Sequence, residues 1–337
     1  MTAENQATSS RTLATAIAGL APGEPIGHAN LTLVPLLGEA RGQILYLLAS
    51  EAIRAGSLTV TEVDQQAMVS ELLATNSGPQ KVFLLDGEEL VGAKQNRILN
   101  TSILLLPGTK IRIPVSCVEQ GRWREVSLTL QSGSCASSSL RARKSRDVSE
   151  SLRRSGRAQS DQGAVWENVA FFAREVASVR PAAMAMSDVI FQRRDSLQAY
   201  VESMPYPPYS RGVMAAINGR FVAADVFDRP QTLEAVWPRL LTGYAIDALA
   251  QGREARRLFT AKAASVLLER VGQVPCDSRP TAGAGEDWRI ETHDIVGQAL
   301  VVDGVCVHLS VFPNDGGEDR AEREPGIAPP SRRRRTR

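Results

Sequence analysis

Three turn dipeptides constrain the fold of this chain more than any other feature. Asp86-Gly87, Asn218-Gly219 and Asp303-Gly304 each separate two segments that are rich in apolar and β-branched residues. Such dipeptides supply the positive φ angles of a type I′ turn, which joins neighbouring antiparallel strands. The pattern therefore predicts hairpins over 81–93, 213–227 and 293–312.

Two more pairs of short apolar segments predict strands in the first half. Residues 31–38 and 44–50 flank a polar link containing glycine, and the simple interpretation is another hairpin. Residues 98–106 and 109–119 are two further predicted strands, joined at Pro107-Gly108. In the second of these strands, Cys117 falls on the apolar side of the alternation, so we expect it in the core.

Apolar residues at helical spacing predict helices in the second half. Ser160 is a favourable N-cap, and Val165, Val169 and Phe172 follow it along one face. Three further helices are predicted over 187–203, 232–251 and 253–271. Together the patterns indicate an α+β fold, mainly antiparallel β-hairpins forming a sheet core, with about four helices in the C-terminal half.

Changes in composition divide the chain into segments. Residues 1–25 are predicted to be a mobile N-terminal segment, and 313–337 a disordered Arg-rich tail. Between them, 26–312 is predicted to be a single α+β domain. It comprises a β-rich half (26–131), a basic connector (132–160) and an α+β half (161–312). The connector is interpreted as a loop because it has few large apolar side chains.

The overall charge and the lack of targeting signals exclude several classes of protein. The 337 residues carry 39 basic and 37 acidic side chains, so no nucleic-acid binding is predicted outside the Arg-rich tail. No window approaches the roughly 18 apolar residues of a membrane span, and no secretory pattern is present, so we expect a cytoplasmic protein without membrane contact. The four cysteines form no CxxC pair and the histidines have no ligand spacing, so we expect no metal and no cofactor.

A dense polar block between Asp86 and Trp123 is the main candidate site for a ligand. Cationic groups beside amide side chains suit a phosphate or carboxylate, and a tryptophan can stack on a base or sugar. The basic connector and the predicted N-terminus of the helix after Ser160 offer further anion-binding groups. The candidate ligand-binding residues are Lys94, Gln95, Asn96, Arg97, Asn100, Arg112, Arg122, Trp123, Arg141, Lys144, Gln162 and Trp166.

A structural interpretation of the same block remains open, because its arginines can also pair with acidic residues across a sheet edge. That set is Arg97, Arg112 and Arg122 with Glu88, Glu89 and Glu119.

Three titratable residues are candidates for acid–base chemistry. Asp225 shares a strand face with apolar residues, so it needs a partner there or an opening to solvent. Glu119 or Asp225 would serve as general base and His308 as acid, provided that these side chains face one cleft. A structural role for His308 is the alternative. No nucleophile-elbow, P-loop or dinucleotide-binding motif is present, so no reaction follows from the sequence.

Several segments together resemble a bacterial family, the "ARG and Rhodanese-Phosphatase-superfamily-associated Protein" domain. They are KQNRILNTSILLLPGTKIRIPVSCVEQGRW, LRARKSR, QGAVW, INGRFVAADVF and GQALVVDGVCVHLSVF. The resemblance covers roughly 27–313. It implies a setting in ADP-ribose or nucleotide metabolism, in stress or conflict systems, because the name records association with ADP-ribosylglycohydrolase and phosphatase-like proteins. It supplies no catalytic residues.

We therefore expect the protein to bind an anionic ligand, a nucleotide or ADP-ribose-like molecule, through a Lys/Asn/Arg cluster on a strand scaffold. The competing hypothesis is a non-catalytic interaction protein that docks a partner enzyme through its basic connector, with Arg141, Arg143 and Lys144 in contact.

Overall fold

A nine-stranded antiparallel sheet is the largest element of the computed structural model, which describes residues 13–42, 44–63, 70–121, 126–179, 184–252 and 258–314. Its strand order is β1-β3-β13-β14-β18-β17-β16-β15, and β2 pairs with β3 beside this path. The strands are β1 (Ala21–Pro22), β2 (Ile26–His28), β3 (Leu31–Leu37), β13 (Ser210–Ile217), β14 (Arg220–Phe227), β15 (Cys276–Pro280), β16 (Glu286–Glu291), β17 (Ile295–Val302) and β18 (Val305–Pro313).

Two smaller sheets are formed by the segment between residues 46 and 135. The first has the order β10-β7-β4, with β4 (Tyr46–Leu48), β7 (Lys81–Leu84) and β10 (Ile103–Leu105). The second has the order β12-β8-β9-β11-β6-β5. Its strands are β5 (Leu58–Glu62), β6 (Glu71–Asn76), β8 (Glu88–Gly92), β9 (Arg97–Leu99), β11 (Lys110–Cys117) and β12 (Leu130–Cys135).

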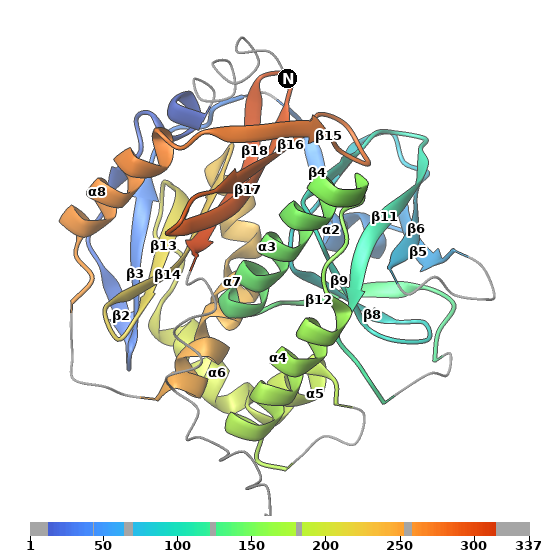
Figure 1. Ribbon diagram of the computed structural model, residues 1–337, viewed down its shortest axis with the longest axis horizontal. Helices are drawn as coiled ribbons and strands as arrows, with labels where there is room; N and C mark the ends of the chain where they lie inside the picture. The colour runs from blue at the N-terminus through green and yellow to red at the C-terminus, as the bar shows by residue number, and fades with distance from the viewer. Residues whose placement is uncertain are drawn as a thin grey trace, which may run out of the picture.

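Helices cover both faces of the large sheet (Figure 1), and the small sheet β10-β7-β4 also packs on it directly, through Phe83 against Phe227 and His308. Helix α8 packs on one face, whereas α3 and α7 pack on the other. The helices are α2 (Ala49–Arg54), α3 (Ser138–Ser155), α4 (Gln162–Glu175), α5 (Met186–Gln192), α6 (Arg194–Ser203), α7 (Pro230–Gln251) and α8 (Ala261–Gly272). Among the described residues, none of the helices has the length and apolarity needed to span a bilayer.

The alternation of side chains along each strand builds two separate cores on the large sheet. In β13, Val213 and Ala215 belong to the core under α7, and Met214 and Ala216 belong to the core under α8. Neighbouring residues of a strand point to opposite faces, so a strand with helices on both sides is apolar throughout. A third core fills the smaller sheets and α2.

Two of the three predicted turn hairpins are confirmed. Strands β13 and β14 pair across Asn218-Gly219, and β17 and β18 pair across Asp303-Gly304. Both residues of each turn have positive φ, between 50° and 76°. The chemistry of the turn therefore determined the pairing where both strands lie in one sheet.

The other predicted hairpins are wrong. Asp86-Gly87 does form a tight turn, but β7 before it pairs with β10 and β4, and β8 after it pairs with β9 and β12. Likewise β3 and β4, predicted as a hairpin, lie in different sheets. In both of these predicted hairpins the chain passes from one sheet to another between the two strands. The predicted strand before Pro107-Gly108 is divided into β9, which pairs with β11, and β10, which pairs with β7.

Residues 132–160 are not a loop, which corrects the prediction of a basic connector. They contain the end of β12 and the 18-residue helix α3. Helix α3 was missed because its buried face is polar, with Arg141 and Lys144 fully inside the protein. Its C-terminus is closed by Gly156 in the left-handed conformation.

Helix number and boundaries also differ from the prediction. Helices occur from α2 onward rather than as about four in the C-terminal half. The helix predicted over 187–203 is divided at Arg193 into α5 and α6, and α8 begins at Ala261 instead of 253. Within the N-terminal segment predicted to be mobile, Leu13 and Ile17 are buried in the core under α8. Residues 1–12 and the predicted tail beyond Asn314 lie outside the described residues.

Candidate functional site

The polar residues singled out from the sequence fall into two buried groups, and the first is centred on Asp225 of β14. Arg141 of α3 donates two hydrogen bonds to this carboxylate, from Nη1 to Oδ2 at 3.0 Å and from Nη2 to Oδ1 at 2.6 Å. The Tyr244 hydroxyl of α7 also donates to Oδ2, and His308 Nε2 lies 3.1 Å from Oδ1. We name this group the Asp225 network; its members are Asp86, Ser102, Arg141, Lys144, Asp225, Tyr244 and His308.

Asp86 extends this network to the smaller sheets. Arg141 Nε donates to Asp86 Oδ2 at 3.1 Å, and the Lys144 ammonium donates to Asp86 and to the carbonyl of Leu99. The side chains of these charged residues are at most 1% exposed. A single guanidinium therefore joins an acid of the large sheet to an acid of the turn between β7 and β8.

Charge compensation keeps this buried group ionised. Burial alone would raise the pKa of Asp225, but the Arg141 guanidinium outweighs burial and holds that pKa well below its ordinary value. Conversely, burial would lower the pKa of Arg141, and the Asp225 carboxylate raises it well above the ordinary range. The predicted need of Asp225 for a partner is met by Arg141.

Ser102, His308 and Asp225 form a hydrogen-bonded chain like that of a nucleophilic triad. Ser102 Oγ lies 2.8 Å from His308 Nδ1, and His308 Nε2 reaches Asp225. However, Ser102 is 2% exposed, its Oγ accepts the Asp86 amide at 2.9 Å, and His308 stacks on Phe227. A nucleophile must reach a reacting atom, so this chain has the connectivity of a triad without an accessible face.

The second group surrounds residues 94–97 and is also internal. Gln95 Nε2 donates to the Glu119 carbonyl at 2.8 Å, and the Asn96 amide donates to Glu119 Oε2 at 3.0 Å. Arg97 is fully buried, lies 3.7 Å from a Glu62 oxygen and donates to Gln95 Oε1 at 3.2 Å. Glu119 therefore anchors the backbone of this group and does not lie in the Asp225 network.

The remaining predicted residues have separate roles. Gln162 fastens the start of α4 to β11, because its amide both donates to and accepts from the Cys117 backbone, at 2.8 and 2.9 Å. Asn100 donates to the carbonyl of Ala158 at 3.0 Å. Arg112 is exposed and pairs with Glu71 at 3.3 Å. Cys117 is buried, as predicted.

Two predicted residues are partly exposed and two are not described. Lys94 and Trp166 are half-buried. Arg122 and Trp123 lie outside the described residues. Among the pairs proposed across the sheet edge, the structure instead joins Arg97 to Glu62, Arg112 to Glu71 and Glu88 to Arg239. Candidate residues that the sequence placed in one site are thus divided between two networks and the surface.

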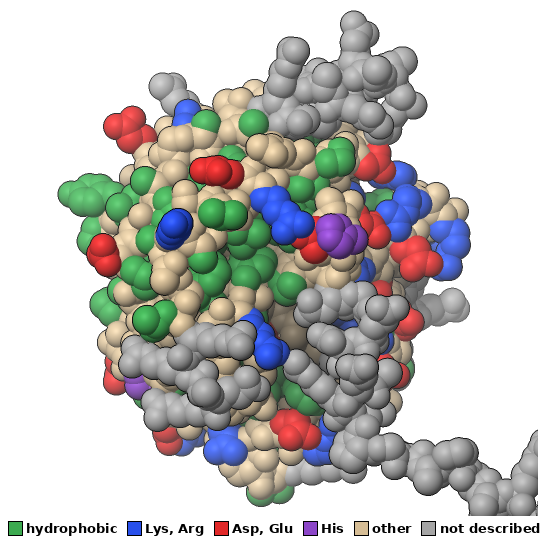
Figure 2. Space-filling view, turned by 60° about the vertical axis from the view of Figure 1, so that its left-hand side comes forward, with side chains coloured by type: hydrophobic (Ala, Val, Ile, Leu, Met, Phe, Trp, Pro, Cys, Tyr) green, Lys and Arg blue, Asp and Glu red, His purple; other side chains and the backbone are tan. Residues whose placement is uncertain are grey.

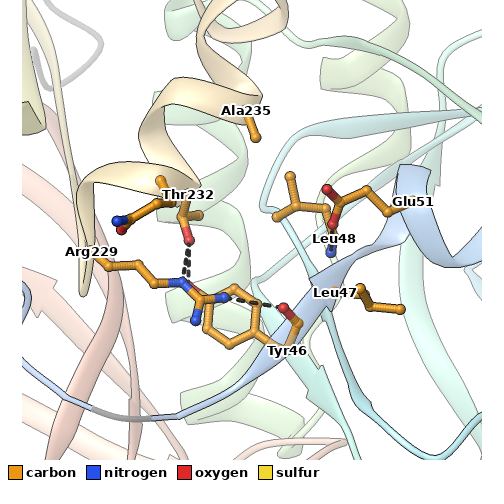
Figure 3. Close-up of a pocket in the computed structure, with 8 residues that line it drawn as sticks. Tyr46, Leu47, Leu48, Glu51, Arg229, Thr232 and Ala235 are labelled. Atoms are coloured by element: carbon orange, nitrogen blue, oxygen red, sulfur yellow. Dashed lines mark hydrogen bonds between the residues drawn. The ribbon is translucent and has the colours of Figure 1, made fainter. Parts of the chain in front are cut away.

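An open cavity lies elsewhere, between the start of α7 and the segment from β4 to α2, and we name it the α7 cavity. Its volume is about 420 Å³. Figure 3 shows Arg229 and Thr232 on one side, with Leu48 and Glu51 on the other. The lining residues are Tyr46, Leu47, Leu48, Glu51, Arg229, Gln231, Thr232 and Ala235.

Arg229 is held rigidly in the wall of this cavity. Its Nη1 and Nη2 donate to the carbonyls of Ile44 and Tyr46, and its Nε donates to Thr232 Oγ1, each at 3.1 Å. The guanidinium lies over the Tyr46 ring, 3.8 Å from the centroid. These contacts fix a cation at the point where α7 begins.

An acid lies behind this arginine. The Tyr46 hydroxyl donates to Asp228 Oδ1 at 2.5 Å, whereas Asp228 Oδ2 is buried without a partner in the part of the chain that the structure describes. Burial raises the pKa of Asp228 above its ordinary value.

Sequence reasoning did not find the residues of the α7 cavity. The available signal was Arg229-Pro230, because proline at the first position of a helix marks a helix start, where free amides face outward. That signal lay outside the polar block. Asp86 was not among the candidate ligand-binding residues, and Tyr244 belongs to the helix predicted over 232–251.

Comparison with known proteins identifies a family. The "ARG and Rhodanese-Phosphatase-superfamily-associated Protein" domain matches residues 19–312, which is most of the chain. The chain belongs to this family. No curated protein and no solved structure matches it. The described residues of this family member contain no group of three or more His, Cys, Asp and Glu side chains that could hold a metal ion.

Proposed function

We propose that the protein binds an anionic ligand of the nucleotide class, with ADP-ribose-like molecules first, in the α7 cavity. Arg229 carries the proposal. It is half-buried in the cavity wall and hydrogen-bonded to three neutral oxygens, and none of the described carboxylates lies within ion-pair distance of it. A fixed cation that forms no ion pair with a described carboxylate favours an incoming anion.

The first turn of α7 adds to this attraction. The helix is 22 residues long, and its N-cap, Arg229, makes no side-chain capping bond. The first amides of a helix have no intrahelical acceptor, and the helix dipole places partial positive charge there. Helix N-termini of this kind hold phosphate groups in many proteins.

The shape and the other wall of the cavity suit the rest of a nucleotide. A volume of about 420 Å³ falls within the range of small-molecule sites. Leu47 and Leu48 offer apolar surface to a base or a sugar face. Glu51 is turned toward the Leu48 amide, from which it accepts a hydrogen bond at 2.8 Å, and lies across the cavity from Arg229 (Figure 3).

The family supports the choice of ligand class. Its description records association with ARG and with the rhodanese-phosphatase superfamily, whose names point to ADP-ribose and phosphate chemistry. This support concerns the setting and names no residue. The expected site, a Lys/Asn/Arg cluster on strands, has Asn96 and Arg97 buried, whereas Arg229 lines an open cavity. We therefore assign the ligand to Arg229 and the start of α7.

A charge change at the exposed Gln231 tests the proposal. Gln231→Glu places a negative charge at the cavity and in the first turn of α7, so it should weaken binding of ADP-ribose about tenfold or more in calorimetric titration. The same charge is favourable at a helix N-terminus, so the melting temperature should not fall. Lost binding with retained stability separates a ligand effect from misfolding.

The matched control is Gln251→Glu, the same substitution at the exposed C-terminal end of α7. It should leave the affinity unchanged. Equal affinity of wild type and Gln231→Glu, or no binding of ADP-ribose, NAD, ATP or phosphate to wild type, would refute the α7 cavity as an anion site.

The competing hypothesis of a docking protein loses the surface on which it was based. Arg141 and Lys144 are buried in the Asp225 network, and Arg143 pairs with Glu167 at 3.2 Å. The exposed basic residues of the 132–160 segment are instead Arg153, Arg154 and Arg157, at and just after the C-terminal end of α3. On the face drawn in Figure 2, basic and acidic side chains are interspersed.

A further inference from the structure

A row of polar side chains crosses the large sheet beneath α3. Residues opposite each other on neighbouring strands point to the same face, so their side chains lie side by side. The row is given by the pairings Asp277 with Arg289, Arg289 with Gln298, Gln298 with Ser310, and Ser310 with Asp225. We name these five residues the polar row.

Helix α3 presents a matching polar face. Arg141, Ser145, Ser149 and Arg153 recur every four residues, which places them along one side of the helix. Arg141 contacts Asp225 at one end of the row, and Arg153 contacts Glu291 of β16 near the other. The two serines therefore lie over the middle of the row, and both are at most 2% exposed.

The middle of the row contains hydrogen-bonding groups that the fold does not use. Arg289 Nη1, both polar atoms of the Gln298 amide, and the hydroxyls of Ser145 and Ser310 are buried without a hydrogen-bond partner among the described residues. Buried polar groups in folded proteins are nearly always paired. Several such atoms along one seam indicate a site that receives a polar molecule.

A cavity opens onto this seam, and we name it the α3 cavity. Its volume is about 260 Å³. Arg289 forms part of its wall while being only 4% exposed, so its unpartnered Nη1 belongs to a buried side chain at the cavity. The lining residues are Ser149, Arg153, Pro275, Cys276, Asp277, Arg289 and Glu291.

The charges around the α3 cavity are already balanced in pairs. Arg289 pairs with Asp287 at 2.5 Å, Arg153 with Glu291 at 2.5 Å, and Arg279 with Asp277 at 2.8 Å. A ligand with net charge would therefore enter a partly buried site without a free counter-charge, which is costly. The site favours an uncharged molecule.

The unused groups are of both hydrogen-bonding types. Arg289 Nη1 and Gln298 Nε2 donate, Gln298 Oε1 accepts, and the serine hydroxyls do either. A hydroxyl group meets both demands, whereas a carbonyl oxygen only accepts and an ammonium group only donates. Pro275 and Cys276 offer apolar surface to the C–H face of a ring.

We propose that the α3 cavity binds a small uncharged polyhydroxylated molecule, a monosaccharide or polyol. Arg289 Nη1 donates to one hydroxyl. The Gln298 amide lies next to Arg289 in the polar row, outside the cavity lining, and exchanges hydrogen bonds with a hydroxyl that reaches inward past Arg289. This site is separate from the α7 cavity, and the proposal does not depend on the anion-binding function.

Two arginines on neighbouring strands provide a matched test. Both Arg279 and Arg289 bind, through Nε and Nη2, an aspartate two residues earlier, but Nη1 of Arg279 donates to the Leu152 carbonyl at 2.7 Å. In saturation-transfer NMR with D-ribose, D-glucose and myo-inositol, wild type should show saturable signals for at least one. Arg289→Lys should weaken that binding about tenfold, the loss of one charge-assisted hydrogen bond, and Arg279→Lys should not.

A second variant tests the inward part of the site. Gln298→Met keeps the length of the side chain and removes both polar atoms, so probe binding should fall as in Arg289→Lys. Gln273→Met, at an exposed position after α8, should bind normally. The circular dichroism spectrum and melting curve of each variant establish that it is folded.

Three results would overturn the proposal. The first is the absence of any saturable signal from the three polyols with wild type, which would mean that ordered water satisfies the polar row. The second is binding that survives in both Arg289→Lys and Gln298→Met. The third is stronger binding of inorganic phosphate or glycine at this site, which would contradict the preference for an uncharged ligand.

Discussion

At the scale of single residues, the pKa values of two buried carboxyl groups are shifted in opposite directions. Asp225 is beside the Arg141 guanidinium, and its pKa lies well below the ordinary value despite burial. Glu89 is equally inaccessible, but its hydrogen-bond partners in the described part of the chain are the neutral side chains of Ser134 and Asn96, and it lies near Glu119. Burial, the largest influence, therefore raises the pKa of Glu89 to about 7.

This difference predicts a pH effect on stability. Because the folded pKa of Glu89 is raised above its ordinary value of 4.5, its stabilising contribution is complete below about pH 4.5 and is lost as the pH rises through 7. The free energy of unfolding of Glu89→Gln minus that of wild type should therefore increase by about 2–3 kcal/mol when the pH is raised from 4.5 to 8. Urea denaturation at the two pH values measures this gain.

The control for Glu89→Gln is Glu234→Gln, at an exposed position of α7, whose stability should follow wild type at both pH values. Parallel pH profiles for wild type and Glu89→Gln would show that Glu89 is ionised in the fold throughout this range.

At the scale of elements, caps and turns were predictable to within a residue or two, whereas strand pairings were predictable only across Asn218-Gly219 and Asp303-Gly304. The sequence predicted Ser160 as the cap of α4, but Asp161 is the N-cap, and its Oδ1 accepts from the amides of Gly163 and Ala164 at 2.8 and 3.2 Å. Ser160 instead lies 2.5 Å from the Ser116 hydroxyl of β11. Serine and aspartate are both favourable N-caps. Asp161 is the cap here because the Ser160 hydroxyl is turned toward Ser116 of β11.

The cap of α4 gives an element-scale prediction. Asp161→Ala should lower the free energy of unfolding by about 1 kcal/mol, because two helix amides lose their acceptor. Asp161→Asn should stay within about 0.5 kcal/mol of wild type, since asparagine caps equally well. Chemical denaturation measures both variants. Equal loss in Asp161→Ala and Asp161→Asn would assign the effect to charge and not to capping.

At the scale of the whole molecule, Arg141 joins the large sheet to the smaller ones. Its guanidinium contacts Asp225 in β14 and Asp86 between β7 and β8, and its side chain is fully buried. Arg141→Met should lower the free energy of unfolding by about 3–5 kcal/mol, because two carboxylates are left buried without their main partner. Urea denaturation measures this loss as a shift of the midpoint.

The matched control, Arg143→Met, lies on the same helix but changes a partly exposed ion pair with Glu167. It should alter stability by no more than about 0.5–1 kcal/mol. A similar small effect of Arg141→Met would mean that the Asp225 network is not a main connection between the sheets.

The sequence by itself determined what depends on neighbouring residues. It gave the α+β class, the turns at Asn218-Gly219 and Asp303-Gly304, the helix that ends at Gln251, the burial of Cys117 and the need of Asp225 for a partner. These follow from periodicity, turn geometry and the cost of burying a charge, which act over a few residues.

Only the tertiary structure decided which distant groups meet. It turned a run of basic residues into the buried helix α3, because Asp86 and Asp225, far apart in the chain, compensate Arg141 and Lys144. It also placed the open cavities at Arg229 and Arg289, away from the polar block. The solvation of an arginine depends on what folds over it, and that information is not local in the sequence.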